Sequence, residues 1–469
     1  MLGSIYAKGV KRVVATVFAM SMATTALGET LAETLSDAYQ HSGAIEQNRA
    51  LLRSADEDVA LALAAMRPIL EWSGSVARSF SDSGVPGLVS NTVTNTASFE
   101  LSSELVLYAG GRLKRGVDLA KESVLATRAS LVGAEQLVLL SAATAFLDIR
   151  EAVETLSLRQ NNVRVLRQEV RAANDRFEVG EVTRTDVALA QAALAEAVAA
   201  LAAAEGSLIT AGEQFHRYVG RDPGNLVAPT SLPKIPASVE EAKKLAVRQH
   251  PDMVQARHAV AAAELQILIA EGAMKPTVAL SGSYGITESL SSDAFEKGGS
   301  IALGASGDIY KGGELSALVR QAIAARDAQR AALHVAYLTV EQDVGIAYSN
   351  LRVAQANKRS FQEQVRAART AFQGVREEAS LGARTTLDVL DAEQDLLDAR
   401  VALISAEVAE FQAAYSVLES VGLMTAEALQ LDVPKFDPSA YYNLVRTAPV
   451  QRSKQGQELD RVLKALGKN

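Results

Sequence analysis

Residues 179–187, Val-Gly-Glu-Val-Thr-Arg-Thr-Asp-Val, recur at residues 381–389 as Leu-Gly-Ala-Arg-Thr-Thr-Leu-Asp-Val. In both copies a glycine stands three residues before a threonine, and an aspartate stands three residues after that threonine. Such a glycine is typical of a helix end, and Thr-x-x-Asp is typical of the capping box that starts the next helix. Each stretch therefore predicts a turn that joins two helices.

The duplication extends far beyond these two stretches. A shift of 202 residues also relates Tyr108-Ala109-Gly110-Gly111 to Tyr310-Lys311-Gly312-Gly313, and a shift of 208 relates Pro68 to Pro276. Because such a register is hard to obtain by chance, the chain is predicted to contain two copies of one unit. The predicted divisions are a first repeat at 29–222, a Pro-rich linker at 223–237, a second repeat at 238–424 and a polar C-terminal tail at 425–469.

Each repeat is predicted to combine two strands with a helical hairpin. Apolar and polar residues alternate over about 69–81 and 97–108, and again over about 277–287 and 300–310. Apolar residues spaced by seven then predict long antiparallel coiled-coil hairpins at about 112–220 and 314–421. The expected fold class is mainly α with a small β part, in two structural repeats.

Residues 1–28 have the three parts of a secretory signal peptide. Basic residues within 8–12 precede an apolar stretch at 13–23, and small residues follow at Ala26 and Gly28. That stretch is too short to span a bilayer, and we expect no membrane-spanning helix after the first thirty residues. Export of a chain without cysteine predicts a location in the envelope of a Gram-negative bacterium.

Composition and motifs argue against several classes of protein. The 469-residue chain carries a net charge of −8, which does not suit nucleic-acid binding, and it lacks the cysteine that a lipid anchor, a disulfide or a thiolate metal site requires. Its five histidines are scattered, and we find no phosphate-binding loop or hydrolase motif. We therefore expect no enzyme activity, no cofactor and no dedicated metal site.

Four strands of membrane length cannot close a barrel by themselves. A single-chain barrel needs about eight strands, and an open sheet edge is not tolerated in lipid. Two, three or four chains could share one barrel, and periodicity alone does not choose among these numbers. The alternative is a soluble sandwich, but a sandwich does not account for an export signal combined with such long helices.

Taken together, these features resemble the TolC family of outer-membrane efflux and secretion channels, in its unlipidated branch. The resemblance covers about 30–430 and rests on three motifs: Arg176-Phe177-x-Val179-Gly180-x-x-x-x-Thr185-Asp186-Val187, Ile309-Tyr310-x-Gly312-Gly313 and Leu381-Gly382-x-Arg384-Thr385-x-x-Asp388-Val389-Leu390-Asp391. It implies a homotrimer whose twelve-stranded β-barrel lies in outer-membrane lipid and continues into an α-helical periplasmic tunnel. It also implies docking to a periplasmic adaptor and to an inner-membrane RND, ABC or MFS transporter.

The resemblance implies a passive exit duct of a tripartite efflux pump or a type I secretion system. Such a duct carries drugs, small molecules or unfolded proteins to the exterior, and the sequence does not indicate which. The alternative is a periplasmic adaptor or a structural coiled-coil envelope protein, which would share the heptads and the signal peptide. An adaptor usually has one helical hairpin flanked by small β-domains, whereas this chain has two hairpins without such flanks.

The predicted functional residues lie at the two helix turns. Those that would contact the adaptor are Val179, Gly180, Thr183, Leu381, Gly382 and Thr385. Predicted aperture and gating residues are Arg384, Asp388, Asp391 and Asp395. The resemblance implies aperture aspartates at Asp388 and Asp391, whose ring could bind cations, and Asp395 continues the same helical stripe.

Alternatives remain open for these charged residues. Asp388 has the position of a capping residue, and acidic residues spaced three and four apart can be a solvated helix face. Arg384 matches a family position that ties the closed tip together, but the usual tyrosine is Ala379 here and the usual acidic partner position falls near Arg171. The candidate replacement partners of Arg384 are Glu178, Glu181, Glu377 and Glu378.

Overall fold

The computed structural model of the chain describes residues 28–465. These residues form two compact units, and each unit draws on both predicted repeats. The tip unit, as we call it, comprises residues 28–42, 135–237 and 345–433 and contains both helix turns. The sheet unit comprises residues 43–134, 238–344 and 434–465 and contains the four strands. The predicted signal peptide, apart from Gly28, lies outside the described residues.

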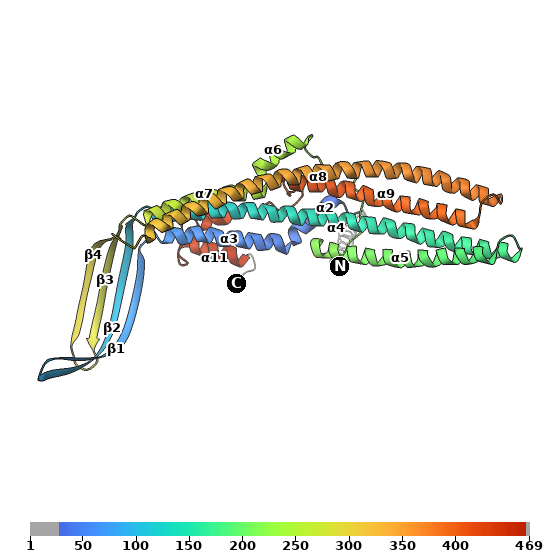
Figure 1. Cartoon of the computed structure of the whole chain (residues 1–469). Coiled ribbons are helices and arrows are strands. Elements are labelled where there is room, and N and C mark those ends of the chain that lie inside the picture. The colour runs from blue at the N-terminus through green and yellow to red at the C-terminus, as the bar shows by residue number, and fades with distance from the viewer. Residues whose placement is uncertain (1–27, 466–469) are drawn as a thin grey trace, which may run out of the picture. The chain divides into compact units, whose positions relative to one another are not determined.

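The sheet unit holds one antiparallel sheet with the strand order β1-β2-β3-β4 (Figure 1). The strands are β1 (Ile69–Val85), β2 (Leu88–Ala109), β3 (Thr277–Ser289) and β4 (Phe295–Ser306). Strand β2 of the first repeat pairs with β3 of the second, and Ser102 stands opposite Ser283. The two repeats therefore contribute to one continuous sheet, whose outer strands are β1 and β4.

The strand boundaries differ from the predicted ones at two places. The first hairpin is longer than expected, because the polar residues between the predicted strands keep pairing until Val85 meets Leu88 across a turn at Gly87 (φ +95°). Strand β4 ends at Ser306, whereas the sequence predicted a strand over about 300–310. Ser306 pairs with Thr277, the first residue of β3, so the described sheet offers residues 307–310 no partner.

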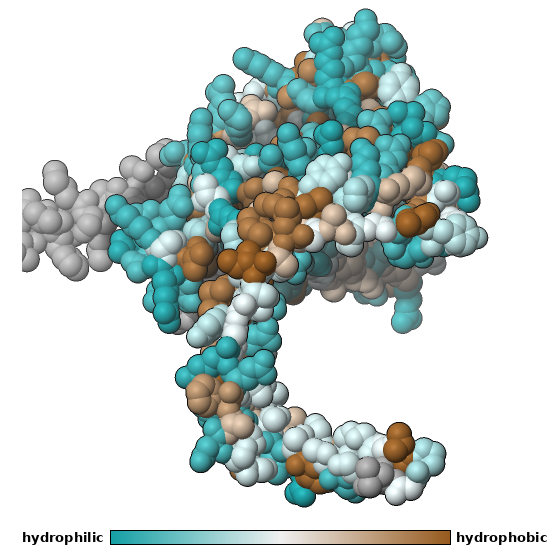
Figure 2. All heavy atoms as spheres, turned by 90° about the vertical axis from the view of Figure 1, so that its left-hand side faces the viewer, coloured by the Kyte–Doolittle hydropathy of each residue, from teal (hydrophilic) through white to brown (hydrophobic). Residues whose placement is uncertain are grey.

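Alternation separates the two faces of the sheet. Glu71, Ser102 and Ser283 stand opposite one another in successive strands and share the polar face. The neighbouring positions form the apolar face, where Trp72 is 73% exposed and Ile301 is 86% exposed. Figure 2 views the molecule from the side on which the sheet lies in Figure 1, and hydrophobic residues (brown) are exposed there at several places. A single chain therefore leaves the apolar face of its sheet uncovered.

The C-terminal tail is partly helical and packs in the sheet unit. This unit contains α3 (Gly43–Ala64), α6 (Val239–Gln249), α7 (Pro251–Gly272), α10 (Ala440–Val445) and α11 (Lys454–Ala465). The hydroxyl of Tyr441 in α10 donates a hydrogen bond to Glu57 in α3 (2.7 Å), and Arg67 donates to the carbonyls of Thr447 and Ala448. The tail, predicted only to be polar, is thus attached to the N-terminal part of the same unit.

The tip unit is built from helices that pack along apolar seams. It contains α2 (Leu31–His41), α5 (Arg184–Val219), α9 (Thr386–Val421) and the C-terminal parts of α4 (Arg112–Glu178) and α8 (Glu314–Ser380). Leu166 of α4, Ala190 of α5 and Leu390 of α9 belong to one buried cluster. Val365 of α8 and Leu396 of α9 belong to a second. Helix α9 therefore packs with both helical hairpins.

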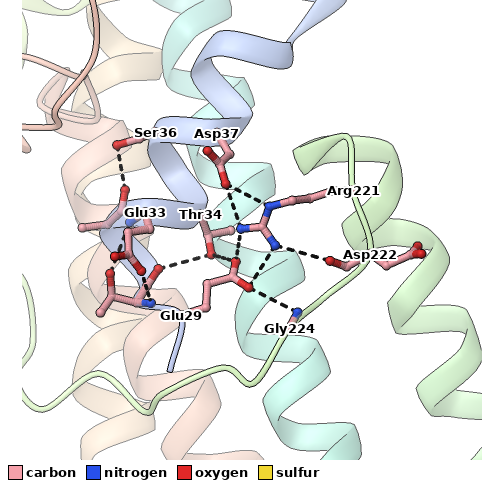
Figure 3. Close-up of polar contacts among 10 residues, drawn as sticks. Glu29, Glu33, Thr34, Ser36, Asp37, Arg221, Asp222 and Gly224 are labelled. Atoms are coloured by element: carbon pink, nitrogen blue, oxygen red, sulfur yellow. Dashed lines mark hydrogen bonds and ion pairs between the residues drawn. The ribbon is translucent and has the colours of Figure 1, made fainter. Parts of the chain in front are cut away.

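An arginine after α5 anchors the beginning of α2 (Figure 3). The guanidinium group of Arg221 donates two hydrogen bonds to the carboxylate of Glu29 (2.5 and 3.0 Å) and two to Oδ2 of Asp37 (2.8 and 2.9 Å). Glu29 also accepts a hydrogen bond from the hydroxyl of Thr34 (2.7 Å) and one from the N–H of Gly224 (3.2 Å). The start of the described chain is thereby attached to the linker between the repeats.

Among residues 28–465, three helices are long and apolar enough to cross a membrane by length and composition: α4, α5 and α9. The expectation that no such stretch follows the first thirty residues is therefore wrong. In α5 the cause is its many alanines, which raise the mean hydropathy although each side chain is small.

Candidate functional site

Both predicted turns end the preceding helix in the same way. Gly180 has φ +81°, and its N–H donates to the carbonyl of Phe177 (3.0 Å), while the N–H of Glu181 donates to that of Arg176 (2.9 Å). The second turn repeats both bonds around Gly382 (φ +79°), again at 3.0 and 2.9 Å. This is the Schellman motif, in which a left-handed glycine allows the last helical carbonyls to be paired.

The next helix starts in the same way at both turns, as the Thr-x-x-Asp spacing predicts. The hydroxyl groups of Thr183 and Thr385 accept hydrogen bonds from the N–H of Asp186 and Asp388 (3.3 and 3.2 Å). In return, Oδ2 of each aspartate accepts a bond from the N–H of its threonine (2.8 and 2.9 Å). Each turn is therefore held by backbone and capping bonds of its own, and its shape is set within one chain.

The turns present apolar side chains to solvent. Val179 is 71% exposed and Leu381 is 85% exposed, and each immediately precedes the glycine of its turn. Apart from the glycine and the two residues adjacent to it in the chain, no heavy atom lies within 4 Å of the place where a Cβ would stand on Gly180 or Gly382. Each turn is thus an open surface with one apolar side chain next to bare backbone. Such a surface can pack against another protein.

Asp388 is engaged by the backbone of its own helix. The hydrogen bonds from the N–H and the hydroxyl of Thr385, with a smaller contribution from the charge of Arg384, lower the pKa of the Asp388 carboxyl. The capping role, one of the two alternatives for this residue, is therefore present in the single chain. A role of Asp388 in a cation-binding aperture remains a prediction.

Asp391 and Asp395 lie on the exposed side of α9, next to Asp388. The opposite side of the helix is apolar and buried, with Leu390 and Leu397 each at most 7% exposed. The structure therefore brings the predicted acidic stripe together on one face. Whether that face borders a lumen depends on neighbouring copies of the chain, so its part in an aperture stays a prediction.

Arg384 has an acidic partner within its own turn. Its Nε lies 2.9 Å from Oε2 of Glu378, one of the four candidates considered from the sequence, and this carboxylate raises the pKa of the arginine. Both side chains are about half exposed. The pair therefore links the end of α8 to the beginning of α9.

Helix α9 also carries a buried glutamate, Glu393, that is not among the residues predicted from the sequence. Glu393 is only 9% exposed, and the hydrogen bond that Asn162 of α4 contributes does not satisfy both of its oxygens. Burial first, and then the charge of Glu169, raise its pKa to about 7. A sequence signal was available, because Glu393 falls between Leu390 and Leu396 at a spacing that places all three on the buried face of a helix.

No group of three or more His, Asp or Glu side chains within residues 28–465 could hold a metal ion. The charged residues of the tip unit that the structure brings together form pairs and caps instead.

Comparison with known proteins agrees with this architecture. The model of the outer membrane efflux protein family matches residues 34–221 and 243–423. The outer membrane efflux protein BepC of Brucella suis is 33% identical over 423 residues, which are 90% of this chain and 91% of that protein. The alkaline protease secretion protein AprF of Pseudomonas aeruginosa is 27% identical over 360 residues, covering 72% and 73% of the two chains. The solved structure of the Campylobacter jejuni CmeC outer membrane channel covers 90% of both chains with a TM-score of 0.76 at 15% identity, and so shows the same fold.

Proposed function

The chain belongs to the outer membrane efflux protein family, and we propose that three copies of it share one β-barrel and one helical tunnel. The resemblance to outer-membrane efflux channels, which rested on the duplicated plan and three sequence motifs, is thereby confirmed. The protein is an outer-membrane exit duct of an efflux pump or a secretion system in a Gram-negative bacterium, with a periplasmic tunnel. The family consists of channel proteins, and the two matched segments cover most of the first and the second repeat, respectively.

The observation that carries the proposal is the uncovered sheet. Strands β1 and β4 each have a neighbour on one side only, and the apolar face that includes Trp72 and Ile301 is exposed. Lipid can cover such a face, but it cannot satisfy the free backbone groups of two open edges. Pairing of β1 of one copy with β4 of the next satisfies both edges, and three copies close a ring of twelve strands.

Helix α5 supports the same assembly. It carries the most apolar of the three long apolar stretches, and only 22% of that stretch is buried within one chain. Val198 is 44% exposed and Ile209 is 67% exposed. A second copy packed along α5 would remove this surface from water, at about 25 cal/mol for each Å² of apolar area.

We infer that the two turns of the tip unit are the contact points for a periplasmic adaptor. Their exposed apolar side chains, Val179 and Leu381, stand beside glycines that leave the backbone accessible. An adaptor and an inner-membrane transporter of the RND, ABC or MFS class would supply both the cargo and the energy. Drugs, small molecules and unfolded proteins all remain candidate cargoes.

The assembly can be tested by cross-linking the open edges, because the natural chain contains no cysteine. We would place one cysteine in β1, at Ser73, and scan a second through Ser300 and its neighbours in β4. We expect at least one pair to give covalent dimers and trimers under oxidation. The matched control is Ser102 and Ser283, which face each other inside one chain and should give only an internal bridge. A native mass of one chain after gentle extraction, with no covalent ladder from any pair, would refute the trimer.

A further inference from the structure

Two glutamates of α9 are almost fully buried, and their surroundings differ sharply. Glu393 and Glu410 are each 9% exposed. Oε2 of Glu410 lies 2.8 Å from the ammonium group of Lys358 in α8, which makes a paired buried charge. Oε2 of Glu393 is buried without any hydrogen-bond partner. Burying an ionised carboxylate without full pairing costs much free energy, whereas burying a protonated carboxyl group costs far less.

Glu393 lies where α9 packs between the two hairpins. Leu390, one turn before it, joins the cluster of α4 and α5, and Leu396, one turn after it, joins Val365 of α8. Helix α4 faces Glu393 with Asn162, which is 5% exposed and hydrogen-bonds to it, and with the carboxylate of Glu169. Helix α8 contributes the guanidinium of Arg376. One like charge and one opposite charge thus act on Glu393 from two different helices.

We propose that Glu393 is a proton-operated latch that holds α9 against α4 when its carboxyl is protonated and releases it when the carboxyl ionises. The protonated group fits the buried seam and keeps its bond to Asn162. The ionised group would leave a charge in an apolar seam, opposite the carboxylate of Glu169, with one oxygen unpaired. Separation of α9 from α4 at this point lets water reach the carboxylate.

The direction of the pH dependence follows from the pKa. Burial and Glu169 raise the pKa of Glu393 from the ordinary value of 4.5 to about 7 while α9 is packed. The packed arrangement therefore binds the proton more tightly than the separated one. Its stability is greatest below about pH 4.5, falls as the pH rises to about 7, and changes little above that.

The consequence for transport rests on the proposed function. Asp391 and the turn at Gly382 belong to the same end of α9, so loosening of α9 from α4 would free this turn to move. A duct with this latch would be easier to open at neutral and alkaline pH than at acidic pH. Glu393 would thus act as a positioning residue for the turn, not as a group that touches the cargo.

Hydrogen exchange of the purified full-length protein tests the latch without any transport assay. We expect exchange of amides in the first part of α9, residues 386–400, to be faster at about pH 8.5 than at about pH 5.5 by on the order of 10- to 100-fold, after correction for intrinsic rates. Glu393→Gln, which keeps the shape of the protonated side chain, should remove this pH dependence. Glu410→Gln is the matched control and should retain the full wild-type dependence.

Two further variants should move the transition in opposite directions. Glu169→Gln removes the like charge and should shift the midpoint to lower pH, whereas Arg376→Gln removes the opposite charge and should shift it to higher pH. Equal exchange at both pH values in the wild-type protein, or an unchanged dependence in Glu393→Gln, would overturn the latch. If the exchange results hold but purified protein forms no conducting channel, the proposed function fails and the latch stands.

Discussion

The guanidinium Nε of Arg384 lies 2.9 Å from Oε2 of Glu378, across the turn between α8 and α9. Both side chains are about half exposed, so the pair adds little to the stability of the fold. Its effect is geometric, because it joins the residue just before a helix cap to the end of the previous helix. The family resemblance suggested an acidic partner for Arg384 on another helix. In this chain the acidic partner is Glu378, at the other side of the same turn.

We predict that Arg384→Gln and Glu378→Gln change channel closure to the same extent. Each variant breaks the same pair, so the double variant should resemble either single one. The measurement is the closed-state conductance of purified channels in planar bilayers, with thermal unfolding as a check that stability is unchanged. Glu377→Gln, an exposed neighbour, is the control. Additive effects of the two single variants would mean that Arg384 has a different partner in the assembly.

Asp391 and Asp388 should respond differently to neutralisation. Asp388→Asn disturbs a capping box, so we expect faster hydrogen exchange in the first turn of α9; the capping role alone leaves ion selectivity unchanged, whereas the aperture role lowers it. Asp391→Asn removes an exposed charge, so we expect lower cation selectivity and weaker block by multivalent cations, with unchanged exchange. Single-channel recording distinguishes the two. Wild-type selectivity in the double Asn variant would place the stripe on the outer surface.

Features that depend on residues close together in the sequence could be predicted, whereas features that depend on distant residues could not. The left-handed glycines and the two capping boxes are set by residues within a few positions, so Gly180, Thr183, Gly382 and Thr385 could be read directly. For Arg384 the sequence left four candidate glutamates as partners, because it does not determine the direction in which a side chain of a turn points. Glu393 was missed although its spacing with Leu390 and Leu396 placed it on the apolar face, and the groups of α4 that act on it lie more than two hundred residues earlier, where sequence does not show them. The helices of the C-terminal tail were missed because short helices depend on tertiary packing.

We expect the hydrogen bonds and ion pairs of Arg221 to contribute most of the stability with which α2 is attached to the linker. Arg221→Gln leaves the carboxylate of Glu29, which is 11% exposed, without its cation, and we expect a loss of about 2 kcal/mol or less, because Arg221 itself is partly exposed. Although burial alone would raise it, the pKa of Glu29 is lowered by its bonds to Arg221 and Thr34. This contribution should therefore be complete above about pH 4.5, the ordinary value, and be lost below it as the pH falls through the lowered pKa of the packed Glu29. Thermal unfolding of Arg221→Gln checks it, with Arg217→Gln as the exposed control.

The attachment of the C-terminal tail should weaken as the pH rises. Asp56 of α3 lies near enough to Tyr441 of α10 for its charge to act on that side chain. Asp56 is fully buried, both of its carboxylate oxygens lack a hydrogen-bond partner, and burial raises its pKa to about 6. The packed form therefore favours the proton, and its stability falls between about pH 4 and pH 6. Limited proteolysis should cleave the tail faster at about pH 8 than at about pH 5. Asp56→Asn should remove this difference, and an unchanged difference would show that another group is responsible.

The glycines of the turns give the last prediction, because conformation and surface can be separated there. Gly382 has φ +79° and open space around it, so a side chain meets no neighbour but the backbone remains strained. Asparagine tolerates this conformation, whereas a β-branched residue in it costs about 1–2 kcal/mol. If the conformation is what matters, Gly382→Asn should keep export near wild type and Gly382→Val should impair it, while both variants still form trimers in the outer membrane. If the bare backbone is itself the contact surface for the adaptor, Asn and Val should impair export alike. Export in cells, together with binding of the purified adaptor to purified channel, distinguishes the two outcomes. Loss of the trimer in Gly382→Val would instead show that the turn is needed for folding, and the same comparison at Gly180 would then tell whether both turns share that role.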